Sequence, residues 1–569
     1  MQAFDWALVA TYFAGLVWIV KWSSKKQQTT ADYFLAGRHA SWFVVGASLF
    51  ASNIGSEHIV GLAGSGASGG MAMAHWELHA WVMLLLGWVF VPFYYQSGVY
   101  TMPEFLERRF NSKTRWVLSV VSLVAYVFTK VSVTVYAGAL VFMTLLPDTF
   151  GTPDNAFWVG AITTVVLTGI YTIFGGLRAV LYTEVAQTVV LLLGSGLITY
   201  FGLKELGGWG ELKAVASENK AGFALWRPLT GVDPTTGATI PWWRNGDFPW
   251  IGILIASPVI GIWYWCTDQY IVQRTLAAKG LTDARRGAIW GGFLKVWPVL
   301  IFLIPGIIGL ALHKKGIISI PLKSEGDLDG DQVFATMVSS LLPVGLRGLV
   351  VAGLISALMS SLASLFNSCA TLFTIDIYQK LKPGKTEKEY VTVGRVATTL
   401  VVVAGLIWIP IMKQMAGGGI YKYLQSVQGY LAPPITAVFL LGLFWRRINA
   451  TGAFYGLVIG FILGMAKLVI EAFVTGQGIQ EGPLWAIAQF NFLYYSGVLL
   501  VISTAIIILL SLATPAPTPD KTDGITWAGL SRKDRRLIKE SWNLWDVLGT
   551  AVVLGLVLGM YLYFTFWLA

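Results

Sequence analysis

The chain has 569 residues, of which 55% are hydrophobic and only 12% are charged. Soluble domains carry roughly 25% charged residues, so this composition excludes an ordinary soluble protein and predicts many apolar runs of about 20 residues. The net charge of +10 comes mostly from short loops between those runs, which is typical of a protein that crosses the lipid bilayer many times and does not indicate a nucleic-acid partner.

Fourteen apolar spans are predicted along the chain. They cover residues 5–22, 42–67, 71–95, 115–145, 156–175, 179–202, 248–272, 286–312, 346–378, 391–413, 420–445, 452–473, 492–513 and 545–567. Lys and Arg cluster after spans one, three, seven, nine and eleven and before the last span. If the spans alternate strictly, these clusters share one side, which the positive-inside rule makes cytoplasmic. Both termini are then outside, and a plasma membrane, such as the bacterial inner membrane, is expected.

The second span carries a polar, glycine-marked gap at its centre. The gap reads Asn53-Ile54-Gly55-Ser56-Glu57-His58 and contains two ionisable residues. Lipid hydrocarbon cannot form hydrogen bonds with unpaired backbone N–H and C=O groups. A membrane helix is therefore interrupted only where it lines a cavity or contacts a ligand. Ionisable residues at that depth mark functional sites. This span therefore predicts a transporter.

Two further charged residues lie inside predicted spans. Glu77 is in the third span and Lys295 is in the eighth. A carboxylate or an ammonium in the membrane costs several kcal/mol unless it is paired or hydrated. The alternative for Lys295 is that its chain reaches back to an interface, and for Glu77 that it lies near the outer mouth.

A second disrupted span follows the first at an interval of five. Residues 248–272 contain Trp263-Tyr264-Trp265-Cys266-Thr267-Asp268-Gln269 at their centre. Two five-span halves that each open with a broken helix indicate an inverted repeat. We predict a first repeat at residues 41–202 and a second at 248–447, joined by an external loop at 203–247. An extra helix and link at 1–40 precede this core. Two peripheral helices at 448–514, a cytoplasmic linker at 515–544 and a last helix at 545–569 follow it.

Hydroxyl and amide side chains mark the ninth and eleventh spans. Ser360 and Ser361 lie in the ninth and suit a hard cation that prefers oxygen ligands, although serines in membrane helices also serve packing. Gln425 and Gln428 share a helical face with Tyr421 in the eleventh. Amides beside aromatic rings suit a polyhydroxylated ring, and the alternative is amide bonding between helices.

Taken together, these strings resemble the sodium/solute symporter family, in particular its sodium–glucose and sodium–myo-inositol cotransporters. The matching segments are SLFASNIGSEHIVGLAGSG, SGVYTMPEFLERRF, WYWCTDQYIVQR, ALMSSLASLFNS and YLQSVQGYLAPPITAVFLLGLFWRR, between about residue 30 and about residue 460. The resemblance implies an all-α membrane protein of about 14 helices with a leucine-transporter-like core of five plus five inverted helices. In this sequence, spans two to eleven would form that core.

The resemblance also implies site residues. The implied sodium ligands are the backbone carbonyls of Ala51, Ile54 and Ala357 and the hydroxyls of Ser360 and Ser361. The implied sugar ligands are Asn53, His58, Glu77, Tyr264, Trp265, Lys295 and Gln425. Tyr264 resembles the inner gate, and Leu62, Trp76 and Tyr421 match the outer hydrophobic gate.

Four positions depart from the family pattern or divide it. His58 stands where bacterial galactose transporters have Gln and animal sugar transporters have His, and Gly261 stands where a polar sugar ligand can occur. Ala363 replaces the Ser or Thr of members with a second sodium site, and Glu184 replaces an Asp linked to that site. We therefore expect one sodium ion per sugar.

The expected function is sodium-coupled symport of a glucose-like or galactose-like monosaccharide. A sodium/myo-inositol symporter is the alternative within the family, and a sugar-gated sensor or channel is the alternative of another class. The scattered polar residues suit binding better than catalysis, so we do not expect an enzyme.

Overall fold

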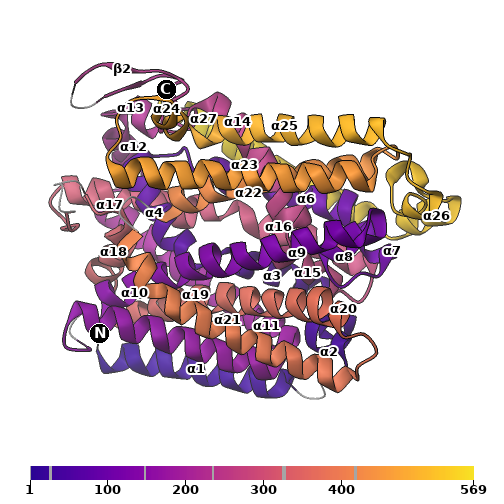
Figure 1. Ribbon diagram of the computed structural model, residues 1–569. Coiled ribbons are helices and arrows are strands. Elements are labelled where there is room, and N and C mark those ends of the chain that lie inside the picture. The colour runs from indigo at the N-terminus through magenta and orange to yellow at the C-terminus, as the bar shows by residue number, and fades with distance from the viewer. Residues whose placement is uncertain (1, 25–27, 147–148, 234–235, 323–327, 416–419) are drawn as a thin grey trace.

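The computed structural model describes residues 2–24, 28–146, 149–233, 236–322, 328–415 and 420–569, without the side chains of residues 128 and 411–421. These residues form helices almost throughout, with one short hairpin of β1 (Gly231–Val232) and β2 (Thr239–Ile240). Most helices run side by side along one direction, as a ribbon view shows (Figure 1). The all-α prediction is confirmed.

Among the described residues, 13 α-helices precede the hairpin. They are α1 Ala3–Ser23, α2 Thr30–Leu35, α3 Trp42–Asn53, α4 Ser56–Gly69, α5 Ala74–Glu77, α6 Ala80–Leu85, α7 Val91–Ser97, α8 Met102–Arg109, α9 Ser112–Ala125, α10 Ser132–Leu145, α11 Pro153–Leu206, α12 Trp209–Ser217 and α13 Lys220–Phe223.

The other described helices follow the hairpin. They are α14 Trp250–Ile262, α15 Gln269–Leu276, α16 Leu281–Val296, α17 Ile304–Lys314, α18 Val333–Leu341, α19 Leu346–Thr371, α20 Gln379–Leu381, α21 Glu387–Met415, α22 Ile420–Phe444, α23 Ala450–Gln477, α24 Pro483–Gln489, α25 Phe492–Ala513, α26 Arg532–Glu540 and α27 Leu544–Phe566. Wider π-helical turns, such as Trp263–Thr267 after α14, join or extend several of them.

Among the described residues, 12 helices are long and apolar enough to cross a membrane. The predicted spans at 156–175 and 179–202 correspond to the two arms of the 54-residue element α11, which is kinked at Gly176. At 1.5 Å per residue that helix would reach about 80 Å if straight, more than twice the roughly 30 Å of a hydrocarbon core. The predicted span at 42–67 is divided between α3 and α4. The count of fourteen spans stays a prediction.

Helix α11 is divided by a sharp change of direction at Gly176. This residue has φ +53°, and a Cβ there would lie 2.7 Å from the carbonyl oxygen of Tyr33. Glycine adopts positive φ at low cost because it has no Cβ. The position therefore joins two membrane-length arms without an intervening loop.

The break predicted in the second span is present at the predicted residues. Helix α3 ends at Asn53 and α4 begins at Ser56, and Ile54 between them has φ −89° and ψ 88°. The residues of the break are buried. The polypeptide therefore leaves helical geometry in the interior of the protein.

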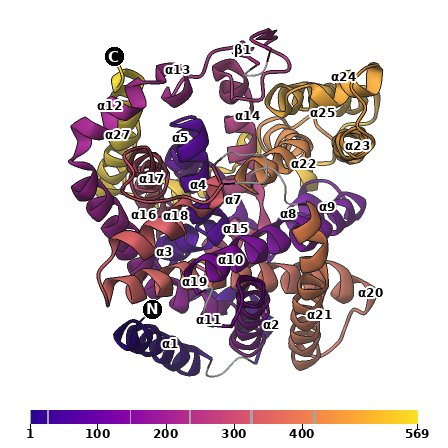
Figure 2. The ribbon, with the colours of Figure 1, turned by 90° about the vertical axis from the view of Figure 1, so that its left-hand side faces the viewer.

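The broken helix lies near the middle of the bundle. Viewed from one end, α3, α4, α10 and α15 are central, while α1, α21, α23 and α27 lie at the periphery (Figure 2). Burial agrees, since 94% of the apolar window of the span at Leu346–Leu381 is buried, against 17% for α1 and for α27. The interior of the bundle is where a polar break finds protein partners.

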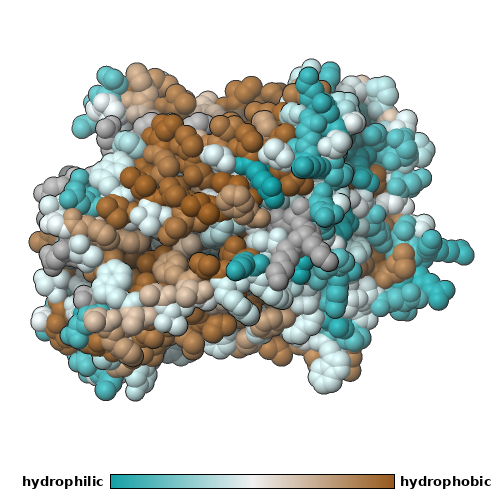
Figure 3. Space-filling view, turned by 90° about the horizontal axis from the view of Figure 1, so that it is seen from below, coloured by the Kyte–Doolittle hydropathy of each residue, from teal (hydrophilic) through white to brown (hydrophobic). Residues whose placement is uncertain are grey.

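Polarity separates the two ends of the bundle. Both termini lie at the left in Figure 1, whereas α8, α20 and α26, which carry basic residues in their last turns, lie at the right. A space-filling view shows hydrophilic residues gathered at that right-hand end and apolar residues over the middle (Figure 3). The predicted basic side of the membrane therefore corresponds to one physical end of the molecule.

Candidate functional site

A cavity of about 40 Å³ lies beside the break, on the side of Asn53. Its lining includes every predicted sugar ligand, which are Asn53, His58, Glu77, Tyr264, Trp265, Lys295 and Gln425. They come from the break, the third predicted span, the π-helical turn after α14, helix α16 and helix α22. The fold therefore brings together residues that are up to 372 positions apart in the sequence.

Lys295 is the centre of the hydrogen bonds in this cavity. Its Nζ lies 2.6 Å from Glu77 Oε2 and donates to Asn53 Oδ1, also at 2.6 Å. Lys295 is 1% exposed and Glu77 is fully buried. Lys295 therefore does not reach back to an interface, and Glu77 does not lie at an open outer mouth. Each charge is offset by the other, as a buried pair requires.

Asn53 connects that ion pair to the aromatic wall of the cavity. Its Nδ2 donates to Tyr264 Oη at 3.0 Å, and the same atom lies 3.4 Å from His58 Nε2. The rings of Tyr264 and Trp265 meet edge to face, with centroids 5.1 Å apart. Polar groups that fix orientation beside aromatic faces are typical of small-molecule sites.

A second buried ion pair, which we did not predict, lies behind Tyr264. Lys130 Nζ is 2.5 Å from Asp268 Oδ2, and Tyr126 donates a hydrogen bond to the same carboxylate. The ammonium also lies 4.7 Å from the ring centroids of Tyr264 and Tyr270, within the range of cation–π attraction. A lone lysine within an apolar span is the same signal that identified Lys295, so the sequence could have indicated Lys130.

His79, which we did not predict as a site residue, explains why a glycine stands at position 261. The His79 ring lies 2.8 Å from Ser257 Oγ, and a Cβ on Gly261 would lie 3.0 Å from His79 Cε1. A larger side chain at position 261 would have to displace the ring. The polar contact that the family pattern places at position 261 is therefore absent, while the imidazole of His79 lines the cavity instead.

The cavity is smaller than a ligand pocket. Its volume of about 40 Å³ is far below the roughly 300–1,000 Å³ typical of such sites. A six-membered ring can enter only if the surrounding side chains or helices move apart. The site therefore requires gates.

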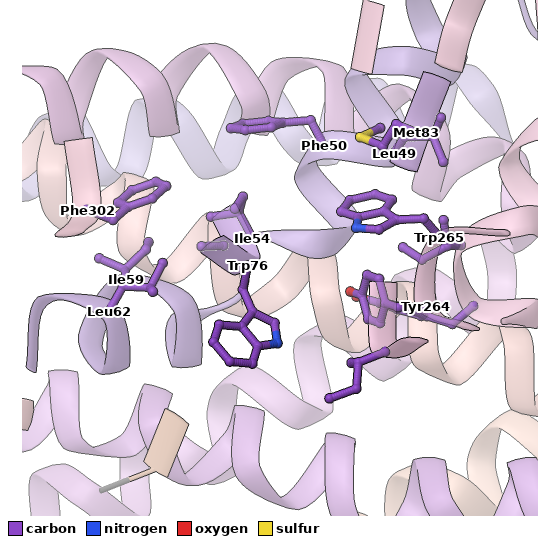
Figure 4. Close-up of a cluster of buried hydrophobic side chains, with 14 of the residues drawn as sticks. Leu49, Phe50, Ile54, Ile59, Leu62, Trp76, Met83, Tyr264, Trp265 and Phe302 are labelled. Atoms are coloured by element: carbon purple, nitrogen blue, oxygen red, sulfur yellow. The ribbon is translucent and has the colours of Figure 1, made fainter. Parts of the chain in front are cut away.

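Of the predicted gate residues, Trp76 and Tyr264 line the cavity, and Leu62 is not part of its lining. In Figure 4, Leu62 and Ile59 of α4 lie on one side of Trp76, and Tyr264 and Trp265 lie on the other. Leu62 is fully buried and Trp76 is 3% exposed. The side chain of Tyr421, the third predicted outer gate, lies outside the described residues.

The break also leaves backbone carbonyls at the predicted sodium site without their helical hydrogen bonds. In a continuous helix, Ala51 O would accept from the Gly55 N–H and Ile54 O from the His58 N–H. Here the Gly55 N–H donates to Asn53 O at 3.2 Å, and the His58 N–H donates to Gly55 O at 3.1 Å. Both predicted sodium-binding carbonyls are therefore free of their helical partners.

Serines of α19 contact the end of α3, at Ala51 and Ser52, and among the described residues no hydrogen bond joins them to Ile54. Ser360 Oγ donates to Ala51 O and to Ala357 O, both at 2.9 Å, and Ser361 Oγ donates to Ser52 O at 3.1 Å. The structure thus joins four of the five predicted sodium ligands to the edge of the break. Carbonyl and hydroxyl oxygens are the ligands that hard cations prefer, and no group of three His, Cys, Asp or Glu suited to a metal occurs among the described residues.

Glu184 lies in a second polar cluster, which reaches α19 one helical turn after those serines. It accepts hydrogen bonds from Ser48, Ser364 and Ser52, the last at 2.8 Å. Arg274 Nη2 lies 3.7 Å from the same carboxylate. The sequence pattern named Glu184 but gave no sign of this arginine, which follows Glu184 by 90 positions.

Comparison with known proteins gives consistent results. Residues 33–460 match the sodium:solute symporter family. The chain is 38% identical to a sodium/glucose cotransporter 4 from Danio rerio over 95% of this chain and 84% of that protein. It is also 38% identical to a sodium/myo-inositol cotransporter from Canis lupus familiaris, over 95% and 77% of the two chains.

Among solved structures, the outward-open, substrate-bound form of a sodium-coupled sialic acid symporter is similar. It superimposes with a TM-score of 0.74 at 20% identity, over 91% of this chain and 99% of that one. This similarity shows a leucine-transporter-like fold.

Proposed function

This chain belongs to the sodium:solute symporter family, and on that premise we propose that it imports a glucose-like or galactose-like monosaccharide together with one sodium ion. It is a sodium-coupled solute symporter and not an enzyme. The sugar, the stoichiometry and the roles of individual residues are the proposed part.

The observation that carries the proposal is the two-sided use of one helix break. Asn53 at the break bonds Lys295 and Tyr264 in the cavity, while the carbonyl of Ala51, two residues earlier, bonds Ser360 on the other side. Sodium bound by the carbonyls and serines fixes the geometry of the break. Asn53 and His58 are then held in position for the sugar, so both ligands favour the same conformer.

Alternating access follows from the gates. Trp76 and Tyr264 line the cavity, and Leu62 lies on the side of Trp76 away from Tyr264; on this proposal, rocking of the two five-helix repeats opens these gates in turn. We place the repeats at residues 41–202 and 248–447 and the basic end of the bundle in the cytoplasm. Both termini, which lie at the opposite end (Figure 1), are then outside a plasma membrane.

One sodium per sugar is supported by the surroundings of Glu184. Three hydroxyls already donate to its carboxylate and Arg274 lies 3.7 Å away, so a second cation at this place would meet a positive charge. A thermodynamic-balance measurement in sealed vesicles tests this. A ratio of two sodium ions per sugar would overturn it.

The function itself is tested by uptake into proteoliposomes. Radiolabelled glucose is expected to accumulate with external sodium and not with choline. One charge crossing the membrane supplies about 2.3 kcal/mol per 100 mV, which sustains roughly a 40-fold gradient. Equal uptake in the two salts would refute the coupling.

Two other outcomes of the same experiment select the alternatives. Accumulation of myo-inositol without glucose favours a sodium/myo-inositol symporter, a substrate named for one of the similar proteins. Sugar-dependent current without accumulation favours a sensor or channel.

The sodium site is tested by Ser361→Ala. Ser361 is fully buried, and its loss removes one of the few oxygens available to the ion. Hydrogen bonds and contacts with charged groups contribute about 1.5–3 kcal/mol, so we expect sodium affinity, measured as the sodium dependence of uptake, to fall at least about tenfold. Ser356→Ala is the matched control, because Ser356 lies on the same helix but donates to Ala352 O and Tyr12. An unchanged sodium dependence in the Ser361 variant would remove this residue from the site.

A further inference from the structure

Glu57 is the second residue of α4 and lines the cavity beside the break. It is 6% exposed, and its Oε2 is buried without a hydrogen-bond partner among the described residues. The carboxylate folds back over the break, because a Cβ on Gly55 would lie 2.3 Å from this oxygen. A buried acceptor without a donor is costly, so a group that supplies a donor here gains binding energy.

Glu77, the other acidic residue among those that line the cavity, is paired with Lys295 at 2.6 Å. Lys130 also lines the cavity; it is 2.5 Å from Asp268, and its charge also attracts that of Glu57. His58 Nδ1 lies 3.6 Å from Glu57 Oε1, which is beyond hydrogen-bond distance. Glu57 also lies in the first turn of α4.

An ionised carboxylate only accepts hydrogen bonds. Gln425 Oε1, which lines the same cavity, is likewise buried without a partner among the described residues. A ligand that satisfies both oxygens must present several O–H donors, and the remaining groups of the cavity, Lys295 and Asn53, also offer donors to its oxygens. A polyhydroxylated ring meets these requirements.

We propose that Glu57 accepts a hydrogen bond from a ring hydroxyl of the substrate and that this contact adds more to the binding of a cyclitol such as myo-inositol than to the binding of a pyranose. A cyclitol presents an O–H on each of its six ring carbons, so it offers Glu57 a donor in every orientation. A pyranose has a ring oxygen that only accepts, and this oxygen is repelled by the carboxylate in some orientations. The inference rests on the proposed sugar site and adds a residue that the family resemblance did not assign.

The test compares competition by myo-inositol and by glucose in the wild type and in Glu57→Gln. Glutamine keeps the shape of the side chain and removes the charge that strengthens the bond. We expect the inhibition constant of myo-inositol to rise at least about tenfold and that of glucose to change by less, so that the ratio of the two constants shifts toward glucose. Equal changes for both sugars, or none, would overturn the proposal.

Two variants keep the result interpretable. Glu57→Asp retains the charge but has a side chain that is shorter by one methylene. If Glu57 bonds the substrate directly, this variant should bind myo-inositol more weakly. Full wild-type affinity would contradict the contact. Glu211→Gln changes the same side chain in an exposed pair with Lys315 and should leave both inhibition constants unchanged.

Binding is measured on detergent-solubilised protein as well as by uptake, so that a transport defect is not read as lost recognition. Sodium dependence should be the same in Glu57→Gln and the wild type, and a large change would reassign Glu57 to the ion. Failure of the wild type to take up either sugar with sodium would refute the proposed function. Wild-type uptake with an unaltered competition ratio in Glu57→Gln would refute only the role of Glu57.

Discussion

Replacing Lys295 by methionine is expected to destabilise the protein by about 3–5 kcal/mol and to abolish sugar binding. Methionine keeps the length of the side chain but leaves Glu77, which is fully buried, without its cation. Removing one partner of a buried pair is strongly destabilising for this reason. Thermal unfolding in detergent and binding of labelled sugar measure the two effects separately.

The double variant Lys295→Met with Glu77→Gln separates the effect on protein stability from the effect on sugar binding. It removes both charges, so most of the lost stability should return, while sugar binding should not, because the donor to Asn53 Oδ1 is still missing. Lys314→Met is the matched control, since Lys314 makes an ion pair of similar length, 2.7 Å, with Glu218 but on the surface. Exposed pairs contribute at most about 1 kcal/mol. A Lys295 variant as stable as the Lys314 variant would show that Glu77 finds another partner.

Replacing Gly306 by alanine is expected to destabilise the protein by about 1–3 kcal/mol, the usual cost of overpacking. Gly306 lies in α17, and a Cβ there would lie 1.9 Å from the backbone oxygen of Ala63 in α4. A backbone atom cannot rotate away, so the two helices must separate. Because α4 carries His58 and Leu62, sugar affinity should fall with stability.

Gly559→Ala provides the comparison for this substitution. Gly559 lies in the peripheral helix α27, and a Cβ there would meet nothing within 4 Å. Alanine is favoured over glycine in a helix by roughly 1 kcal/mol, so this variant should be as stable as the wild type or more so. A Gly306 variant with an unchanged unfolding temperature would mean that α4 and α17 are not in close contact.

Features that depend on neighbouring residues were predictable from the sequence. The polar string from Asn53 to His58 predicted the position of the break, because the conflict between polar residues and hydrocarbon is local. Gathering of the predicted sugar ligands in one cavity was predictable only through the family resemblance, which supplies the three-dimensional arrangement that spacing lacks.

Features that depend on distant partners were not predictable from the residues themselves. The pairing of Lys295 with Glu77 spans 218 positions, and that of Lys130 with Asp268 spans 138. The charges of these residues showed that partners were required but not which ones. The ring of His79 against Gly261 likewise follows from the packing of two helices, and a histidine and a glycine carry no pattern that indicates it.

The tight change of direction at Gly176 has a consequence for how the protein is made. A single buried glycine joins the two arms of α11 without a connecting loop. We therefore expect the arms to enter the bilayer together, as a helical hairpin. A larger residue at this position would obstruct assembly of the nascent chain against Tyr33 before any transport cycle begins.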